Sequence, residues 1–247
     1  MIPRALWYLG LALIAVITTG LQLDKQAHRS PDFAHVVPEP FRAFAQAWIA
    51  EDALAGADAQ AALEAAQVLV ARRPVPAEHL TLLALAQLKA GDSRKASQSI
   101  QLSAQRGWRE ITAQETLARL ALEAGNGAEA SRRYIALLVQ SRVPDEMLLD
   151  LGPLVFAPGA DEARSTMAEI ISGSVRWTGL LLARGPRVMP PDAFADVMRR
   201  SIARGAVYDC GDFERAVRIL ARRDNTAGAA LAADPPAGCT IDRSEAI

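Results

Sequence analysis

Apolar and polar positions divide the chain into three parts. Residues 5–23 form a run of nineteen positions without a charged side chain, and a short segment containing Pro31, Pro38 and Pro40 follows it. From Phe41 onward, apolar residues recur three and four positions apart, which is typical of amphipathic α-helices. Short turns of Gly or Ala with Asp or Asn separate these stretches. The pattern predicts an apolar N-terminal helix, an extended proline-rich spacer and then antiparallel helix pairs, with few or no strands.

The N-terminal apolar run has the charge and the length of an export signal. Arg4 and the amino terminus provide positive charge before it. As a helix it is roughly 28 Å long, close to the ~30 Å hydrocarbon core of a bilayer, and Trp7 and Tyr8 lie where an interfacial belt begins. We expect an uncleaved anchor; the alternatives are cleavage near the small residues Thr18 and Gly20, or a buried core helix. Positive charge on the short side predicts a single-pass inner-membrane protein whose C-terminal domain lies in the periplasm.

The helical part repeats with a step of thirty-four residues. Four kinds of position keep this step without a gap: a turn pair, a small residue in the second helix, and an apolar and a small residue in the first helix. These residues are Ala57-Asp58, Gly91-Asp92 and Gly125-Asn126; Ala62, Ala96 and Ala130; Ile49, Leu83 and Leu117; and Ala50, Ala84 and Ala118. The pattern resembles the tetratricopeptide repeat (TPR) family, whose unit is a helix, a turn and a helix. The resemblance implies an all-α solenoid of helical hairpins that binds proteins.

This resemblance covers three units, about residues 43–144. A fourth unit begins near Asp145 but departs from the pattern, because Arg164 takes the position of the small alanine. Later helical segments have no clean period and are expected to cap the stack. We therefore expect an anchor or signal segment over 1–24, a spacer over 25–40, TPR-like repeats over 41–176, capping helices over 177–233 and a tail over 234–247.

In the TPR family, exposed positions of each first helix line the inner wall that binds the partner. The resemblance places positions of each first helix on that wall, and the six candidate partner-binding residues among them are Leu85, Leu88, Lys89, Glu115, Arg119 and Leu122. Leucines among single charges suit an amphipathic helix or an extended segment as the ligand. Packing of these leucines against a neighbouring helix is the alternative.

Charge offers a second candidate surface. The whole chain has 27 basic and 28 acidic side chains, which gives no electrostatic case for nucleic acid. Residues 176–223 nevertheless contain ten arginines against five acids. An anionic glycan or lipid would be bound there by Arg199, Arg200, Arg222 and Arg223. An ordinary solvated helix surface is the alternative.

Cys210 and Cys239 are the two cysteines of the chain, and in an exported protein they are expected to form a disulfide. Two unrelated thiols are the alternative. His28, His35 and His79 have no metal-ligand spacing with either cysteine, so no metal site is predicted.

Motifs of catalysis are absent from the sequence: it has no glycine-rich phosphate loop, no nucleophile elbow and no H-E-x-x-H pair. We expect neither an enzyme nor a cofactor. The predicted function is a membrane-anchored periplasmic TPR-like scaffold or adaptor that binds a protein partner in an envelope assembly or secretion system. The alternative is an accessory protein that binds an anionic glycan or lipid through its arginine-rich C-terminal helices.

Overall fold

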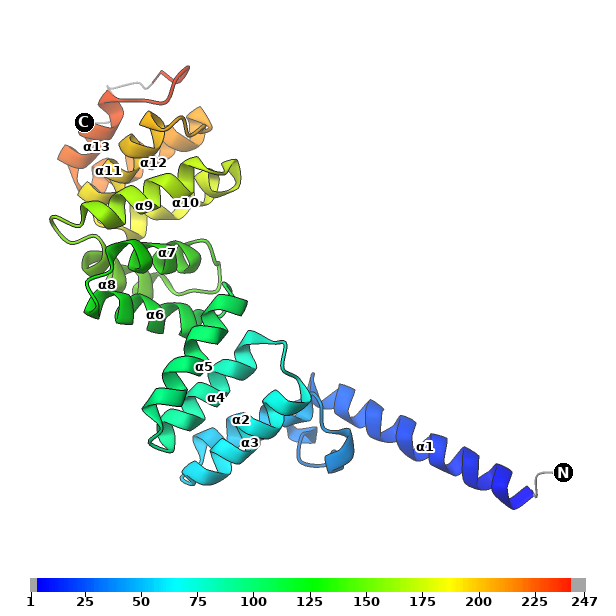
Figure 1. Cartoon of the computed structure of the whole chain (residues 1–247). Helices are drawn as coiled ribbons and strands as arrows, with labels where there is room; N and C mark the ends of the chain where they lie inside the picture. The colour runs from blue at the N-terminus through cyan, green and yellow to red at the C-terminus, as the bar shows by residue number, and fades with distance from the viewer. Residues whose placement is uncertain (1–3, 241–247) are drawn as a thin grey trace. The chain divides into compact units, whose positions relative to one another are not determined.

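The computed structural model describes residues 4–240, of which Arg176 is described in its backbone alone. These residues form thirteen α-helices and two short 3-10 helices, with no strand among them, which confirms the all-α prediction (Figure 1). Residues 1–3 of the predicted anchor and residues 241–247 of the predicted tail lie outside the described residues. The chain divides into two compact units, Met1–Glu110 and Ile111–Ile247, so the boundary between the units falls inside the region predicted as repeats.

Unit 1 consists of one long N-terminal helix, a folded connection and two helical hairpins. Its elements are α1 (Arg4–Ala27), η1 (Pro31–Phe33), η2 (Glu39–Phe41), α2 (Ala45–Ala55), α3 (Ala59–Arg72), α4 (Ala77–Lys89) and α5 (Ser93–Arg106). The helices α2 and α3 form one hairpin, α4 and α5 form the other, and α3 packs on α4. Each hairpin buries small residues where its two helices meet, such as Ala84 of α4 and Ala96 of α5.

The hairpin turns are built by the same local chemistry every thirty-four residues. Asp58, Asp92 and Asn126 each accept a hydrogen bond from the backbone of the first turn of the helix that follows. These side chains satisfy N–H groups that have no partner inside the helix. Gly91 and Gly125, which precede two of the caps, have positive φ angles of 84° and 68° and end the first helix of their hairpins.

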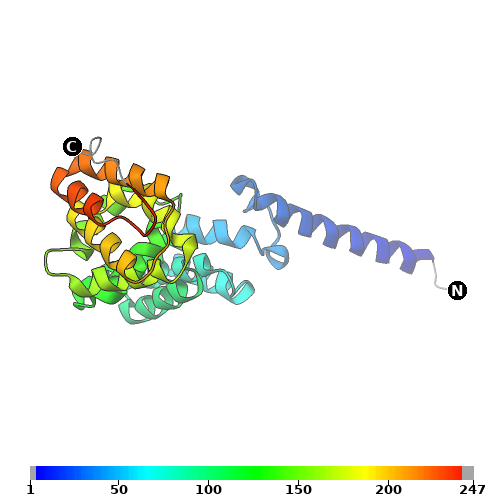
Figure 2. The same ribbon diagram turned by 90° about the horizontal axis from the view of Figure 1, so that it is seen from above.

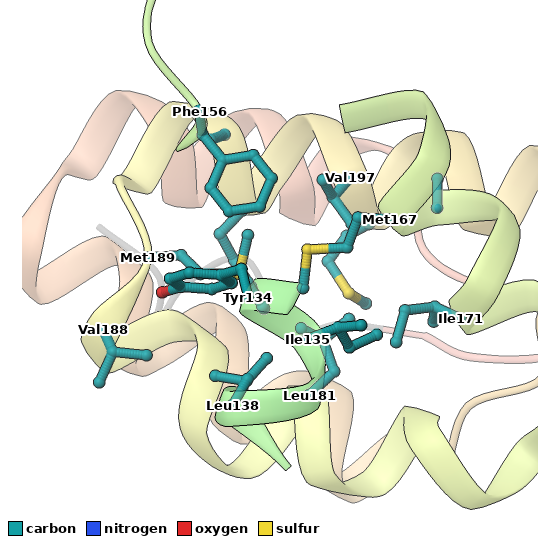
Figure 3. Close-up of a cluster of buried hydrophobic side chains, with 14 of the residues drawn as sticks. Tyr134, Ile135, Leu138, Phe156, Met167, Ile171, Leu181, Val188, Met189 and Val197 are labelled. Carbon is teal, nitrogen blue, oxygen red and sulfur yellow. The ribbon is translucent and has the colours of Figure 1, made fainter. Parts of the chain in front are cut away.

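In the part of unit 2 that the structure describes, residues 111–240, there are eight helices. They are α6 (Ile111–Glu123), α7 (Gly127–Leu138), α8 (Asp145–Val155), α9 (Asp161–Ser172), α10 (Val175–Val188), α11 (Pro191–Ala203), α12 (Cys210–Arg223) and α13 (Asn225–Ala233). One hydrophobic cluster extends from α6 to α13. Figure 3 shows part of it, including Tyr134, Phe156, Met167 and Leu181, in the space between the helices. The helices predicted to cap the stack therefore share one core with the helices before them.

Candidate functional site

The helix α1 has two environments along its length. Its described residues before Gly20 are exposed on every side, whereas Gly20, Asp24 and Ala27 are buried in unit 1. The helix is long and apolar enough to cross a membrane, as the sequence predicted. A helix that is apolar all round and has no protein cover suits a lipid environment.

Asp24 connects the end of α1 with the start of α2 through hydrogen bonds. Its side chain is 4% exposed. Its Oδ1 accepts hydrogen bonds from the backbone N–H groups of Ala43, Phe44 and Ala45, each at 2.9 Å, and its Oδ2 accepts from Phe44 at 3.1 Å. These groups begin α2, where the helix dipole favours a carboxylate. Asp24 is therefore the N-terminal cap of a helix that begins twenty-one residues later.

The segment expected to be an extended spacer instead folds against α1 and α2. It forms η1 and η2, and it buries Ala34 and Val37 in a cluster with residues of both helices. Phe41 packs directly on the backbone of α1, because a Cβ placed on Gly20 would lie 2.5 Å from Cδ2 of the ring. Glycine at this position thus permits the close approach.

This junction was not predicted from the sequence. A helix start is normally recognised by Ser, Thr, Asp or Asn at the N-cap position, but that position of α2 is occupied by Phe44, which provides no side-chain cap. Two features of the sequence could have indicated the junction. One is the missing local cap at Phe44, and the other is the single acid, Asp24, at the end of the apolar run.

The predicted wall residues of unit 1 differ in their surroundings. Leu85 and Leu88 of α4 are exposed, Leu88 to 57%, so neither is buried within the hairpin. Lys89 has a structural contact, since its Nζ donates hydrogen bonds to the backbone carbonyls of Leu54, at 2.7 Å, and Gly56. These carbonyls lie at the end of α2, where a cation is favoured.

The predicted wall residues of unit 2 lie on α6. Arg119 pairs with Glu115 one turn earlier, at 2.8 Å. Leu122 is half-buried and packs against the hydrophobic cluster of unit 2. Since the six residues belong to two units, a common binding wall stays a prediction.

Two of the four predicted anion-binding arginines are held by contacts within unit 2. Arg200 bridges Asp161 at 2.7 Å and Asp196 at 2.8 Å, and the hydrogen bond to Asp161 is the main cause that raises the pKa of Arg200. Arg223 donates hydrogen bonds to the carbonyls of Pro186 and Met189, at 2.6 and 3.0 Å.

The other two arginines have fewer contacts with the rest of unit 2 among those described. Arg199 is exposed and lies 3.4 Å from Asp196, and Arg222 is exposed on α12. The four predicted arginines therefore do not present four free guanidinium groups.

Cys210 and Cys239 form a disulfide, as predicted, with their Cα atoms 5.3 Å apart. Cys210 is the first residue of α12 and Cys239 follows α13, so the bond closes a loop that contains both helices. In the chain-entropy account, a loop of this length stabilises the fold by about 3 to 4 kcal/mol.

The histidines have ordinary structural partners. Nδ1 of His79 lies 2.8 Å from the carbonyl oxygen of Arg73, and burial lowers the pKa of this imidazole. Nε2 of His35 lies 2.9 Å from Oδ2 of Asp52. Within residues 4–240, no group of three His, Cys, Asp or Glu side chains is arranged to hold a metal ion.

No protein-family model, curated protein or solved structure matches this chain. Its function is therefore inferred from α1, from the junction around Asp24 and from the exposed face of α4.

Proposed function

We propose that this protein is a membrane-anchored scaffold or adaptor. In this proposal α1 holds the chain in the inner membrane, and a TPR-like helical domain binds a protein partner of an envelope assembly or secretion system in the periplasm. The observation that carries the proposal is the junction between an exposed apolar helix and a helical domain. Asp24 and Gly20 of α1 contact the start of the domain, and these contacts support an apolar helix that is retained with the domain.

Three recurring features support the TPR-like interpretation of the hairpins. Asp58, Asp92 and Asn126 cap the second helices at a constant step, and Gly91 and Gly125 end the first helices in the same backbone conformation. In the third feature, an arginine at the end of a second helix donates to backbone carbonyls before the first helix of its own hairpin. Arg72 does so to Glu39 and Arg42, and Arg106, thirty-four residues later, does so to Pro74.

The exposed leucines of α4 support the protein-binding part of the proposal. Leu85 and Leu88 are one turn apart on one helix, so they offer adjacent apolar contacts to a partner segment. The glycan- or lipid-binding alternative has weaker support, because Arg200 and Arg223 already have partners inside unit 2.

A photo-crosslinking amino acid at position 88 tests the partner surface in living cells. We expect one discrete crosslinked product from position 88, and its loss when Leu85→Glu is added. The matched control is position 102 on α5, where Leu102 is 45% exposed. Equal crosslinking from both positions, or none from position 88, would contradict a binding surface on α4.

The orientation is tested separately with Ala90→Cys, an exposed position in the turn between α4 and α5. Since both native cysteines are in the disulfide, the introduced side chain would carry the one free thiol. A membrane-impermeant maleimide applied to spheroplasts should label it without lysis. Labelling that requires lysis would place the domain in the cytoplasm and overturn the periplasmic assignment.

A further inference from the structure

The connection between α1 and α2 folds back along α1 rather than leading away from it. We call residues 31–41, which include η1 and η2, the foot. Its Pro38 and Phe41 line a shallow apolar groove on α1 together with Ala15, Thr19 and Leu23. Figures 1 and 2 both show this loop beside the last turns of α1. Pro38 and Phe41 of the foot therefore lie level with residues of the apolar run.

The depth of the foot follows from the geometry of the helix. If residues 5–23 span the hydrocarbon core, Leu23 lies at its boundary. With a rise of about 1.5 Å per residue, Gly20 lies roughly 4.5 Å inside this boundary and Ala15 roughly 12 Å inside it. Phe41 touches Gly20 directly, so the ring cannot be withdrawn into water while this contact is kept.

Two exposed apolar side chains of the foot suit contact with lipid. Val36 is 63% exposed and Phe33 is 42% exposed. The backbone N–H groups of Ala34 and Phe41 donate to the carbonyls of Pro31 and Pro38, at 2.8 and 2.9 Å. These internal hydrogen bonds lower the cost of bringing the backbone toward hydrocarbon.

Charged side chains at the end of α1 fit the adjoining headgroup layer. Lys25 and Arg29 are exposed just beyond the apolar run, where cations meet lipid phosphates. Asp32 and Glu39 of the foot are exposed as well, and Glu39 pairs with Arg72 at 3.4 Å. His35 turns toward Asp52 of α2, with its Nε2 2.9 Å from Oδ2.

We propose that the foot is a second membrane contact, in which Phe33 and Val36 insert at the headgroup and acyl boundary of the leaflet from which α1 emerges. This inference rests on the proposed anchoring by α1. The apolar surface of α1 continues into the foot. This continuity argues that the lipid around α1 also contacts the foot. Two contacts, one through α1 and one through the foot, would set the tilt of unit 1 on the membrane.

Depth-dependent fluorescence quenching tests this contact on the full-length protein in phosphatidylcholine vesicles. The variants Leu13→Cys, Val36→Cys and Leu102→Cys each carry one free thiol for an environment-sensitive fluorophore, because the native cysteines are bridged. Lipids with a nitroxide at a shallow or a deep acyl position serve as quenchers. We expect a loss of fluorescence at position 36 with the shallow nitroxide, a loss at position 13 with the deep one, and no loss at position 102.

The experiment distinguishes failure of the α1 anchor from failure of the membrane contact by the foot. Quenching at position 13 without quenching at position 36 would leave the anchor standing and overturn the foot. No quenching at position 13 would overturn the anchor, and with it both the proposed function and the foot. A second labelled position, Phe33→Cys, repeats the measurement if the label at position 36 changes the helical content of the protein.

Discussion

Asp24 shows how one side chain can decide the geometry of a junction. Its carboxylate is buried, but three backbone N–H groups satisfy its oxygens, so the cost of burying the charge is offset by charge-assisted hydrogen bonds. An alanine would leave those groups, which are buried or partly buried, without acceptors. Orphaned buried donors of this kind cost about 1 to 3 kcal/mol.

We therefore predict that Asp24→Ala loosens the start of α2. The amide hydrogens of residues 43–45 should exchange about five- to 150-fold faster, since a cost of about 1.4 kcal/mol corresponds to one factor of ten. Hydrogen exchange read by mass spectrometry in detergent micelles measures this change. The control is Asp52→Ala, which removes an exposed partner of His35 and should leave residues 43–45 unaffected. Equal exchange in both variants would contradict the capping role.

Two buried glutamines have hydrogen-bond partners that could not be predicted from the sequence. Gln46 and Gln114 stand where the repeat pattern has a bulky apolar residue, and both are buried. Nε2 of Gln46 donates to the carbonyl of Ala65, and Oε1 of Gln114 accepts from Arg133. Each partner lies on the second helix of the same hairpin. Periodicity shows that such a position faces inward, but the partner that satisfies a polar side chain there depends on tertiary packing.

His79 supports a prediction of pH dependence. Burial lowers the pKa of this imidazole below 6.5 in the folded state. As pH falls below about 6.5, the unfolded chain therefore takes up a proton that the folded chain does not, and unit 1 loses stability. His79→Asn keeps a donor for the carbonyl of Arg73 and cannot titrate. Urea unfolding at pH 7.5 and pH 5.5 should show a smaller loss for this variant; identical losses would contradict the assignment.

At the scale of elements, the hairpins follow from short-range chemistry and the foot does not. Apolar spacing and the Gly-Asp and Gly-Asn turns were enough to place α4 to α7. The prolines of the foot predicted extended backbone, yet Pro31 and Pro40 occupy first-turn positions of 3-10 helices, where the missing N–H costs nothing. Their folding depends on contacts with Gly20 and Ala27, about ten to twenty residues away in sequence, which no local pattern reveals.

The turn glycines allow a matched prediction. Gly91 has a φ angle of +84°, in the left-handed region, so Gly91→Ala should destabilise unit 1 by about 1 kcal/mol. Gly56 ends α2 in the preceding hairpin. Its φ angle is −67°, which alanine adopts without strain. Gly56→Ala should therefore be neutral or slightly stabilising. Urea midpoints of the two variants test this contrast, and equal destabilisation would contradict it.

At the scale of the whole molecule, the two units have separate means of stabilisation. Unit 1 contains no cysteine and depends on small hairpin cores and on the junction with α1. Unit 2 has one continuous core and the disulfide between Cys210 and Cys239. The sequence repeat does not predict this division, because the step of thirty-four residues runs across the boundary between Glu110 and Ile111.

Removing the disulfide should consequently affect one unit and not the other. In the double variant Cys210→Ser and Cys239→Ser, the loop containing α12 and α13 gains freedom in the unfolded state, which should reduce the stability of unit 2 by up to about 3 to 4 kcal/mol. Hydrogen exchange measured on one sample compares residues 210–240 with residues 45–106, which act as the internal control. Faster exchange confined to unit 2 is the expected result. Equally faster exchange in residues 45–106 would mean that the two units unfold as one, and the separate roles given to them would have to be abandoned.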